Sequence, residues 1–461
     1  MDINTILVIL MFASFIVLLF TGYPIAFVLL GVSIVFALIG YLSDIFLGSS
    51  TLLGYMSVGM ITSRIYSTLE NWVLVALPMF IYMGLMLDRS GMAEKMLFSM
   101  QEMFGKVRGG LAVAVTGMGI LLAASTGIIG ASVVMLGALA LPPMIKQGYS
   151  KALATGTVCA SGTLGILIPP SVMLVMMADQ LQLSVGDLFM GALAPGLLLG
   201  FGYIVYLLVY SFLNPQHAPL AADRRPFHFG VLWDVIKAVL PAFGLIIAVL
   251  GSIFAGIATI TEASAVGALG ATLIALVNRK LNLKILREVI HSTFNIMAYI
   301  FAILIGASCF ALVLRLLGGD QVFASFLTSL PIGPYGVLIV ILLLVFFLGF
   351  FLDWIEITFI VLPLIAPAID KLNLAINGFG VLERPDMVWF TLLIAICLQT
   401  SFLPPPVGFA IFYLKGACPP EVALSDIYKG IIPFVIVQVI VLAIVMLWPE
   451  LVTWLPSIAY R

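Results

Sequence analysis

The chain has 461 residues, of which 63% are hydrophobic and only 9% are charged. A soluble domain needs more polar surface than this, so most of the chain must be solvated by lipid. The net charge of −1 provides no basic surface for nucleic acid, and the four cysteines lack the spacing of a metal site or a disulfide framework.

Membrane-spanning helices need about 20 apolar residues each. The N-terminal segment has no basic start, so we interpret it as a retained helix and not as a signal peptide. Ten segments reach or approach the required length: 3–21, 24–42, 73–88, 152–178, 188–213, 238–257, 262–278, 292–317, 388–413 and 431–448. Segments 43–72 and 279–291 are more polar, and we expect them at the membrane interface. Thr259 and Glu262 have the spacing of a capping box.

Two further apolar regions, 111–142 and 335–369, are interrupted by polar residues. The first is broken at Ser125-Thr126-Gly127 and Gly130-Ala131-Ser132, and the second at Asp353. Each half has only about 14–18 residues, which is short for a bilayer. We therefore expect each region to be a re-entrant helical hairpin whose second arm starts near Ser132 or Asp353.

The basic residues are consistent with this topology. If both hairpins are re-entrant and 89–110 is cytoplasmic, 15 of the 20 Lys and Arg lie on cytoplasmic connections. These are Arg89, Lys95, Lys106, Arg108, Lys146, Lys151, Arg224, Arg225, Lys237, Arg279, Lys280, Lys284, Arg287, Lys415 and Lys429. The bias follows the positive-inside rule and places both termini outside the cytoplasm.

Similar motifs recur in the two halves in the same order. Ser132 precedes Pro142 by ten residues, as Asp353 precedes Pro363. Further along, the segment Ile168-Pro169-Pro170-Ser171-Val172 has a counterpart in Leu403-Pro404-Pro405-Pro406-Val407.

The expected layout gives each half five spans, so the second half is upside down relative to the first. The repeats are 1–213 and 238–461, and 214–237 is a polar cytoplasmic linker. The fold class is therefore an all-α polytopic membrane protein with two inverted repeats and two hairpins. Inverted repeats with broken helices indicate a secondary transporter.

The proline runs at 169–170 and 404–406 lie inside long apolar segments. Proline breaks helical hydrogen bonding, and the freed carbonyls must face protein or a polar cavity because lipid offers no donor. Such carbonyls suit Na⁺, and the N-termini of the following half-helices favour anions.

We predict one sodium site in each repeat, with the substrate between the hairpin tips. The first site would use Gly127, Gly130, Ala131, Ser132, Gly165, Ile168 and Pro170. The second would use Gly349, Asp353, Thr400, Ser401 and Leu403. Substrate contacts would come from Ser125, Thr126, Ser132, Ser171, Asp353 and Glu356. Sodium is the expected coupling ion; we expect no other metal, no organic cofactor and no catalytic residue.

Structural alternatives remain open at these positions. Helix-breaking prolines can act only as kinks, and Gly and Ser in membrane helices usually serve packing. Ser132 could be only an N-cap, and Asp353 with Glu356 could form only a capping box. An acidic pair at membrane depth nevertheless favours a functional site. Arg315 could attract an anionic substrate, but snorkelling to the interface or pairing with Asp320 is the simpler interpretation.

The chain resembles the large membrane subunit of tripartite ATP-independent periplasmic (TRAP) transporters over essentially its whole length. The motifs that carry the resemblance are Gly22-Tyr23-Pro24, Leu77-Pro78-Met79-Phe80, Gly130-Ala131-Ser132, Gly148-Tyr149, the run from Ser161 to Ser171, Thr261-Glu262-Ala263 and Leu352-Asp353. The sequence Asp353-Trp354-Ile355-Glu356 is similar to the branch labelled for mannitol or chloroaromatic compounds.

The resemblance implies sodium-driven uptake of an organic acid or related solute by an elevator mechanism. It also implies a small four-helix membrane subunit, a periplasmic solute-binding protein, and a bacterial or archaeal cytoplasmic membrane. Two departures concern the ion sites. Pro404 stands where the family usually has threonine, and Ile129-Gly130-Ala131-Ser132 replaces a Ser-Gly-Ser-Ser tip.

Three other functions are alternatives. A self-sufficient secondary transporter of the same fold would work without a binding protein, and only the family resemblance argues against it. A polytopic membrane enzyme would need a catalytic constellation, and we find no Ser–His pair and no HExxH motif. A channel fits inverted hairpins less well than alternating access does.

Overall fold

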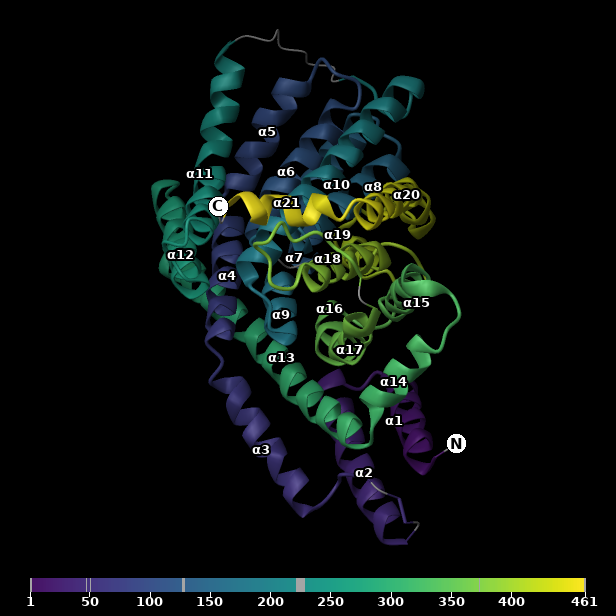
Figure 1. Cartoon of the computed structure of the whole chain (residues 1–461). Helices are drawn as coiled ribbons and strands as arrows, with labels where there is room; N and C mark the ends of the chain where they lie inside the picture. The colour runs from purple at the N-terminus through teal and green to yellow at the C-terminus, as the bar shows by residue number, and fades with distance from the viewer. Residues whose placement is uncertain are drawn as a thin grey trace.

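The computed structural model describes residues 2–46, 48–49, 51–126, 129–220, 229–372 and 374–459, and the regular elements within these ranges are helical. One group of helices, here called the frame, extends along one side and beneath the rest of the molecule (Figure 1). The frame comprises α1 (Ile3–Leu19), α2 (Ile25–Phe46), α3 (Tyr55–Leu69), α4 (Trp72–Arg89), α5 (Met92–Phe104), α11 (Phe229–Phe254), α12 (Ile260–Val277), α13 (Leu283–Leu316) and α14 (Gly319–Thr328).

The remaining helices form a compact group, here called the core. It begins with α6 (Gly110–Thr126), α7 (Ile129–Lys146), α8 (Lys151–Thr163), the 3₁₀ turn η1 (Leu164–Ile166), α9 (Val172–Leu181) and α10 (Val185–Leu213). It continues with α15 (Gly333–Leu348), α16 (Trp354–Glu356), the π-helical turn η2 (Ile357–Val361), α17 (Leu362–Leu372), α18 (Pro385–Ser401), α19 (Phe409–Ala417), α20 (Leu424–Leu447) and α21 (Glu450–Ala459). A hairpin, an interrupted helix and a long helix thus follow one another in each half.

Small residues let the frame helices approach closely. Gly306 of α13 lies against α2, where a Cβ would come within 2.9 Å of the Ala26 carbonyl oxygen. Between α4 and α12, the Tyr82 and Thr272 hydroxyl oxygens are 3.0 Å apart and hydrogen-bonded. Close backbone packing and interhelical hydrogen bonds are the interactions that hold helices together in lipid, where burial of apolar surface adds little.

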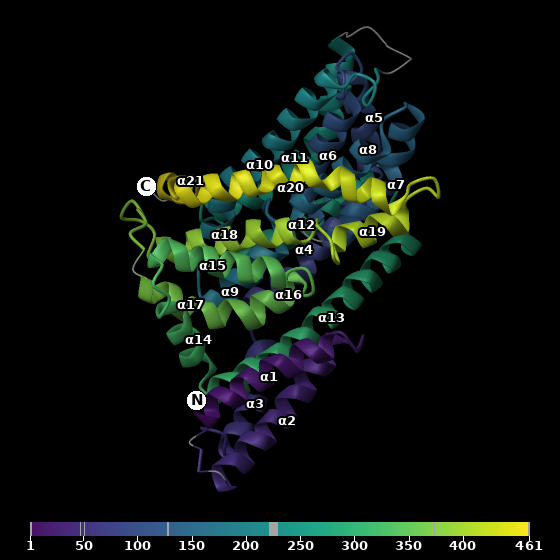
Figure 2. The ribbon, with the colours of Figure 1, turned by 90° about the vertical axis from the view of Figure 1, so that its right-hand side faces the viewer.

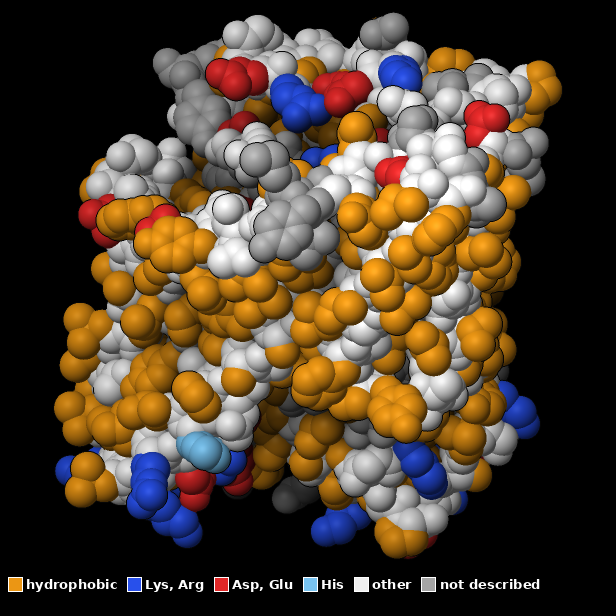
Figure 3. Space-filling model, turned by 90° about the horizontal axis from the view of Figure 1, so that it is seen from below, with side chains coloured by type: hydrophobic (Ala, Val, Ile, Leu, Met, Phe, Trp, Pro, Cys, Tyr) orange, Lys and Arg blue, Asp and Glu red, His pale blue; other side chains and the backbone are white. Residues whose placement is uncertain are grey.

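The outer surface has the pattern of a membrane protein. Hydrophobic side chains form a band across the face in Figure 3, and charged side chains gather along its two edges. Among the described residues, eight helices are long and apolar enough to cross a bilayer. Both termini lie at the same end of the long helices in Figure 2. That this end lies outside the cytoplasm stays a prediction.

The structure changes several predicted segments. The expected spans 152–178 and 388–413 are each two helices with an irregular segment between them. Segment 279–291 is not a separate interfacial element, because most of it belongs to α13, which runs unbroken from Leu283. Asn282 is the N-cap of this helix, and its side-chain Oδ1 accepts the Ile285 N–H at 2.8 Å. Segment 43–72 contains α3, which packs against α13.

The described part of the second arm of the first hairpin runs from Ile129. Ser132 therefore lies inside this helix and is not its N-cap. The second hairpin breaks where expected, since Asp353 is the N-cap of α16. The acidic break was therefore correctly located from the sequence.

Two local pairings are confirmed. Thr259 and Glu262 form the capping box at the start of α12: the Thr259 N–H donates to Glu262 Oε2 at 2.8 Å, and the Glu262 N–H donates to Thr259 Oγ1 at 3.3 Å. The Arg315 Nε donates to Asp320 Oδ2 at 2.9 Å, which supports the simpler interpretation of that arginine.

The two halves of the core meet most tightly where α8 crosses α20. A methyl group at Gly156 would overlap the carbonyl oxygen of Gly430, and one at Gly430 would overlap that of Ala152. Since backbone atoms cannot yield as a flexible side chain can, this crossing requires glycine on both helices.

We therefore expect Gly156→Ala to destabilise the protein by about 1–3 kcal/mol, the usual cost of overpacking. The measurement is equilibrium unfolding in mixed detergent micelles, followed by circular dichroism. Gly244→Ala is the matched control, because nothing lies within 4 Å of the Cβ it would add. Equal unfolding curves for the two variants would contradict the proposed importance of the crossing.

Candidate transport site

Two interrupted helices lie inside the core. The first runs from α8 through η1 to α9, and the second from α18 to α19. The peptide bonds Pro169–Pro170 and Pro405–Pro406, both cis, lie in the two irregular segments. Every residue of α8 from Leu153 and every residue of α18 from Met387 is buried up to the helix end. The predicted breaks are therefore real, and they lie in protein, as backbone polarity requires in a membrane.

At the first break, two carbonyls lose their helical donors, and only one of them is compensated. Pro169 has no N–H for the Gly165 carbonyl four residues earlier, and Pro170 has none for that of Ile166. The Ile166 carbonyl is compensated, because the Ser171 hydroxyl donates to it at 2.5 Å. The buried Gly165 carbonyl is thus a candidate ion ligand, in agreement with its place in the predicted first sodium site.

The second break frees a carbonyl in the same way. Pro405 has no N–H for the carbonyl of Ser401. The neighbouring carbonyls have partners: that of Thr400 accepts the Leu403 N–H at 3.4 Å, and that of Phe402 accepts the Ala410 N–H at 3.2 Å. The Ser401 carbonyl is therefore the corresponding candidate ligand of the predicted second sodium site.

Two hydroxyl groups can supplement this second site. Thr400 Oγ1 donates to the Ile396 carbonyl at 2.8 Å, and Ser401 Oγ donates to that of Leu398 at 2.7 Å. A hydroxyl that donates its proton keeps lone pairs for a cation. Both residues are buried, as is Leu403, so these oxygens could replace the hydroxyl that Pro404 lacks.

The second hairpin meets the second break directly. Gly349, which follows α15, lies so close to Ser401 that a methyl group there would overlap the serine side chain. This contact brings together two members of the predicted second site that are 52 residues apart in sequence. A glycine is therefore needed where the hairpin approaches the interrupted helix.

The first hairpin packs on the first interrupted helix. A Cβ at Gly119 of α6 would lie 2.7 Å from Ser161 Cβ, and one at Gly162 of α8 would lie 2.6 Å from a Val133 methyl group. Ser132 and Val133 are buried against this helix, while Gly130 and Ala131 are partly exposed. Of the other predicted tip residues, Gly127 and the side chains of Ser125 and Thr126 lie outside the described part of the chain.

Three further predicted residues lie in the first break. Ser171 is the N-cap of α9, where its hydroxyl accepts the Leu174 N–H at 3.4 Å. Ile168 is buried against Gly196 of α10, and Pro170 is also buried. These contacts have structural roles, so substrate binding by Ser171 stays a prediction.

The acidic pair occupies the second hairpin tip. Asp353 is partly exposed, and its Oδ1 accepts the Trp354 N–H at 2.8 Å. Glu356 has no exposed surface, and no side chain of the described residues donates a hydrogen bond to its carboxylate. The Asp353 side chain accepts the Trp354 N–H and not that of Glu356, so the two residues do not form a complete capping box, although Asp353 is the N-cap.

Three residues near these elements were not predicted. Tyr299 of α13 lies near Asp353 and Glu356, and Tyr413 of α19 lies near Asp353. The Tyr413 ring also packs on the first tip, 3.1 Å from a Cβ built at Gly130. Gln399 of α18 is fully buried with both amide atoms unpaired among the described residues. Of these three residues, only Gln399 could have been identified from the sequence, because it is a polar residue within an apolar segment.

Comparisons with known proteins agree with this architecture. Residues 12–451 match the family described as "Tripartite ATP-independent periplasmic transporter, DctM component". A C4-dicarboxylate TRAP transporter large permease protein of Vibrio cholerae is 30% identical over 413 residues, with 84% of this chain and 86% of that protein covered. An ectoine TRAP transporter large permease protein of Halomonas elongata is 27% identical, with 98% and 99% covered.

The fold has a counterpart among solved structures. The crystal structure of the Alcanivorax borkumensis YdaH transporter, whose title describes an unusual topology, matches with a TM-score of 0.59. The match covers 97% of this chain and 99% of that one at 12% sequence identity, so it concerns the fold alone. The sequence match along nearly the whole length, together with an all-helical membrane fold built around two interrupted helices, shows that the chain belongs to the DctM family of large TRAP transporter permease subunits.

Proposed function

We propose that this chain is the membrane-embedded carrier of a sodium-driven uptake system for a small organic acid or related solute. It would receive the solute from a periplasmic binding protein and move it across the cytoplasmic membrane by an elevator mechanism. The observation that carries this proposal is the pair of buried interrupted helices, each with a hairpin packed against its break. Such breaks supply ion and substrate ligands in secondary transporters.

Sodium coupling is supported by the chemistry of the two breaks. Each offers a buried carbonyl that has lost its helical donor, at Gly165 and at Ser401. The second also offers the hydroxyls of Thr400 and Ser401, and the hairpin whose Gly349 contacts Ser401 carries the carboxylate of Asp353. Hard oxygen ligands of this kind suit a small cation, and no soft or imidazole ligand is involved.

The elevator mechanism is supported by the division into frame and core. The breaks and the hairpins belong to the core, whereas α1–α3 and the long α13 belong to the frame (Figures 1 and 2). Helix α13 passes beside α16 and η2, so the second tip lies at the boundary between the two groups. A rigid movement of the core along α13 would carry both tips together.

The partners follow from membership of a tripartite family. We propose a small membrane subunit that packs against the apolar outer faces of the frame, and a solute-binding protein that docks where the core opens to the periplasm. Exposed frame residues such as Phe27, Ile34 and Tyr66 provide apolar surface for a neighbouring helix or for lipid.

Reconstitution with the small subunit in proteoliposomes tests the function as a whole. With a solute authenticated by its cognate binding protein, we expect uptake that requires both an inward sodium gradient and that protein. Uptake with sodium alone would instead support the self-sufficient carrier. A folded complex that takes up nothing under any gradient would remove the transport proposal.

A substitution of Asp353, at the tip of the second hairpin, tests the second sodium site. Asp353→Ala should raise the sodium concentration for half-maximal uptake by about tenfold, because one lost carboxylate ligand costs at least about 1.4 kcal/mol. Asp234→Ala, which changes an exposed carboxylate on α11, is the control. Unchanged sodium activation in a well-folded Asp353→Ala protein would exclude that residue from the site.

A substitution of Thr400, at the end of α18, tests the contribution of the interrupted helix to the second sodium site. Thr400→Ala should weaken sodium activation by a few-fold, because it removes one hydroxyl ligand. Thr391→Ala is a close match: Thr391 is buried on the same helix, nearly three turns before the break, and donates to the Met387 carbonyl at 2.6 Å. If both variants shift sodium activation equally, the effect of Thr400 is structural.

A further inference from the structure

Helix α13 carries a line of polar side chains on one face of its first half. This group, here called the polar stripe, consists of Lys284, Glu288, His291, Asn295 and Tyr299. Their spacing of three or four residues places them one above another on an α-helix. Glu288 is partly exposed and the other four are exposed, with Tyr299 50% exposed.

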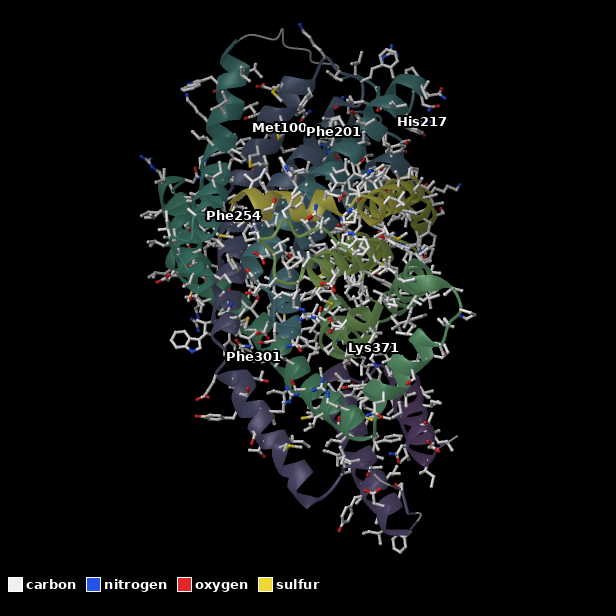
Figure 4. All side chains as sticks on the ribbon, in the orientation of Figure 1. Met100, Phe201, His217, Phe254, Phe301 and Lys371 are labelled. Carbon is white, nitrogen blue, oxygen red and sulfur yellow. The ribbon has the colours of Figure 1, made fainter. Side chains whose placement is uncertain are left out.

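An apolar face of the same helix lies beside the polar stripe. Leu283, Ile290 and Phe294 are 85%, 53% and 67% exposed, and Phe301, which is labelled in Figure 4, continues this face. Phe294 and Asn295 are adjacent, so they have nearly the same depth but point about 100° apart. The phenylalanine suits lipid, whereas polar side chains at membrane depth face protein or a water-filled cavity. The polar stripe therefore faces water.

The stripe begins at a cavity. In Figure 2, α13 starts at the end of the molecule opposite to both chain termini, which is the predicted cytoplasmic end. A cavity of about 550 Å³ lies there, and it is lined by Leu283, Lys284, Arg287, Glu288 and His291. Two members of the stripe and the carboxylate between them thus share one opening at the edge of the membrane.

The stripe ends beside the second hairpin tip. Helix α13 packs against α16 and η2, and Tyr299 lies near Asp353 and Glu356. Lys284 and Tyr299 are 15 residues apart, which is about 22 Å along a helix. One polar face therefore connects the cavity with the tip that carries the predicted second sodium site.

The rim of the cavity is positively charged. The Glu288 carboxylate pairs with Arg89 Nη1 at 3.6 Å, so α4 supplies a charge that balances it. Lys284 and Arg287 are exposed, and neither forms an ion pair within the part of the chain that the structure describes. These two residues are here called the basic rim. A cleft lined by charge of one sign raises the local concentration of ions of the opposite sign.

We propose that the polar stripe lines the aqueous route by which the solute leaves the second tip for the cytoplasm, and that the basic rim draws an anionic solute outward. This inference rests on the proposed transport function and adds to it the exit route and the charge of the solute. An anion that leaves the tip moves away from Asp353 and toward Lys284 and Arg287, so the electrostatic potential favours release.

Cysteine accessibility tests the route without requiring transport. The background is Cys418→Ser, because the other three cysteines are buried. In inside-out membrane vesicles that contain the large and small subunits, we would measure modification by the impermeant anion 2-sulfonatoethyl methanethiosulfonate. Asn295→Cys should react at least about tenfold faster than Phe294→Cys, because a thiol in lipid stays protonated. His291→Cys and Tyr299→Cys should also react.

Equal rates at Asn295→Cys and Phe294→Cys would overturn the route, because the two faces would then have the same surroundings. Protection of all three stripe positions in the folded complex would also overturn it and would assign this face to lipid or to the small subunit.

The charge of the reagent tests the basic rim. We would compare the sulfonate reagent with its trimethylammonium analogue at Asn295→Cys and divide the ratio of rates by that for a free thiol. Lys284→Gln combined with Arg287→Gln should lower this ratio by about tenfold, and less at high salt. Lys106→Gln combined with Arg108→Gln removes two exposed charges elsewhere and is the matched control. An unchanged ratio would refute the basic rim.

Uptake connects the route with transport. In proteoliposomes, Lys284→Gln combined with Arg287→Gln should slow uptake of an anionic solute at least about threefold. The sodium concentration for half-maximal uptake should stay the same, because the ion site is untouched. Unchanged uptake along an accessible route would overturn its role in release and leave the transport function standing. No sodium-driven uptake of an authenticated solute by the unsubstituted complex would instead refute the transport function itself.

Discussion

Lipid offers no hydrogen bond to a bare carbonyl, and the organisation of the core follows from that constraint. Helices α8 and α18 are interrupted by proline, and both are buried on all sides as they approach the break. The hairpins, α10 and α20 enclose them. The carbonyls freed at Gly165 and Ser401 therefore remain inside protein, where an ion can replace the missing N–H donor.

Close packing depends on glycine at the points where these elements meet. Gly349 allows the second hairpin to reach Ser401, Gly162 allows the first hairpin to reach α8, and Gly156 with Gly430 joins the two halves of the core. Without side chains in the way, polar groups of different helices come within reach of a single ion or solute. The same residues that permit packing thus also position the candidate site.

Charge is distributed unequally between the two tips. The first presents backbone and small side chains, whereas the second presents Asp353 and Glu356. One carboxylate is partly accessible and the other is sealed within the hairpin. This asymmetry makes the second tip the stronger candidate for binding a cation.

The sequence alone determined the features that depend on local chemistry. Its composition required a membrane, its prolines located both breaks, and Thr259 with Glu262 specified the start of α12, because each of these effects acts within a few residues along the chain. The tertiary structure decided which helix faces meet. It placed Gly349 on Ser401, brought Tyr413 to Gly130, and put Ser132 inside α7 and not at its N-cap. Contacts between residues far apart in sequence depend on helix orientation and packing, which local periodicity does not encode.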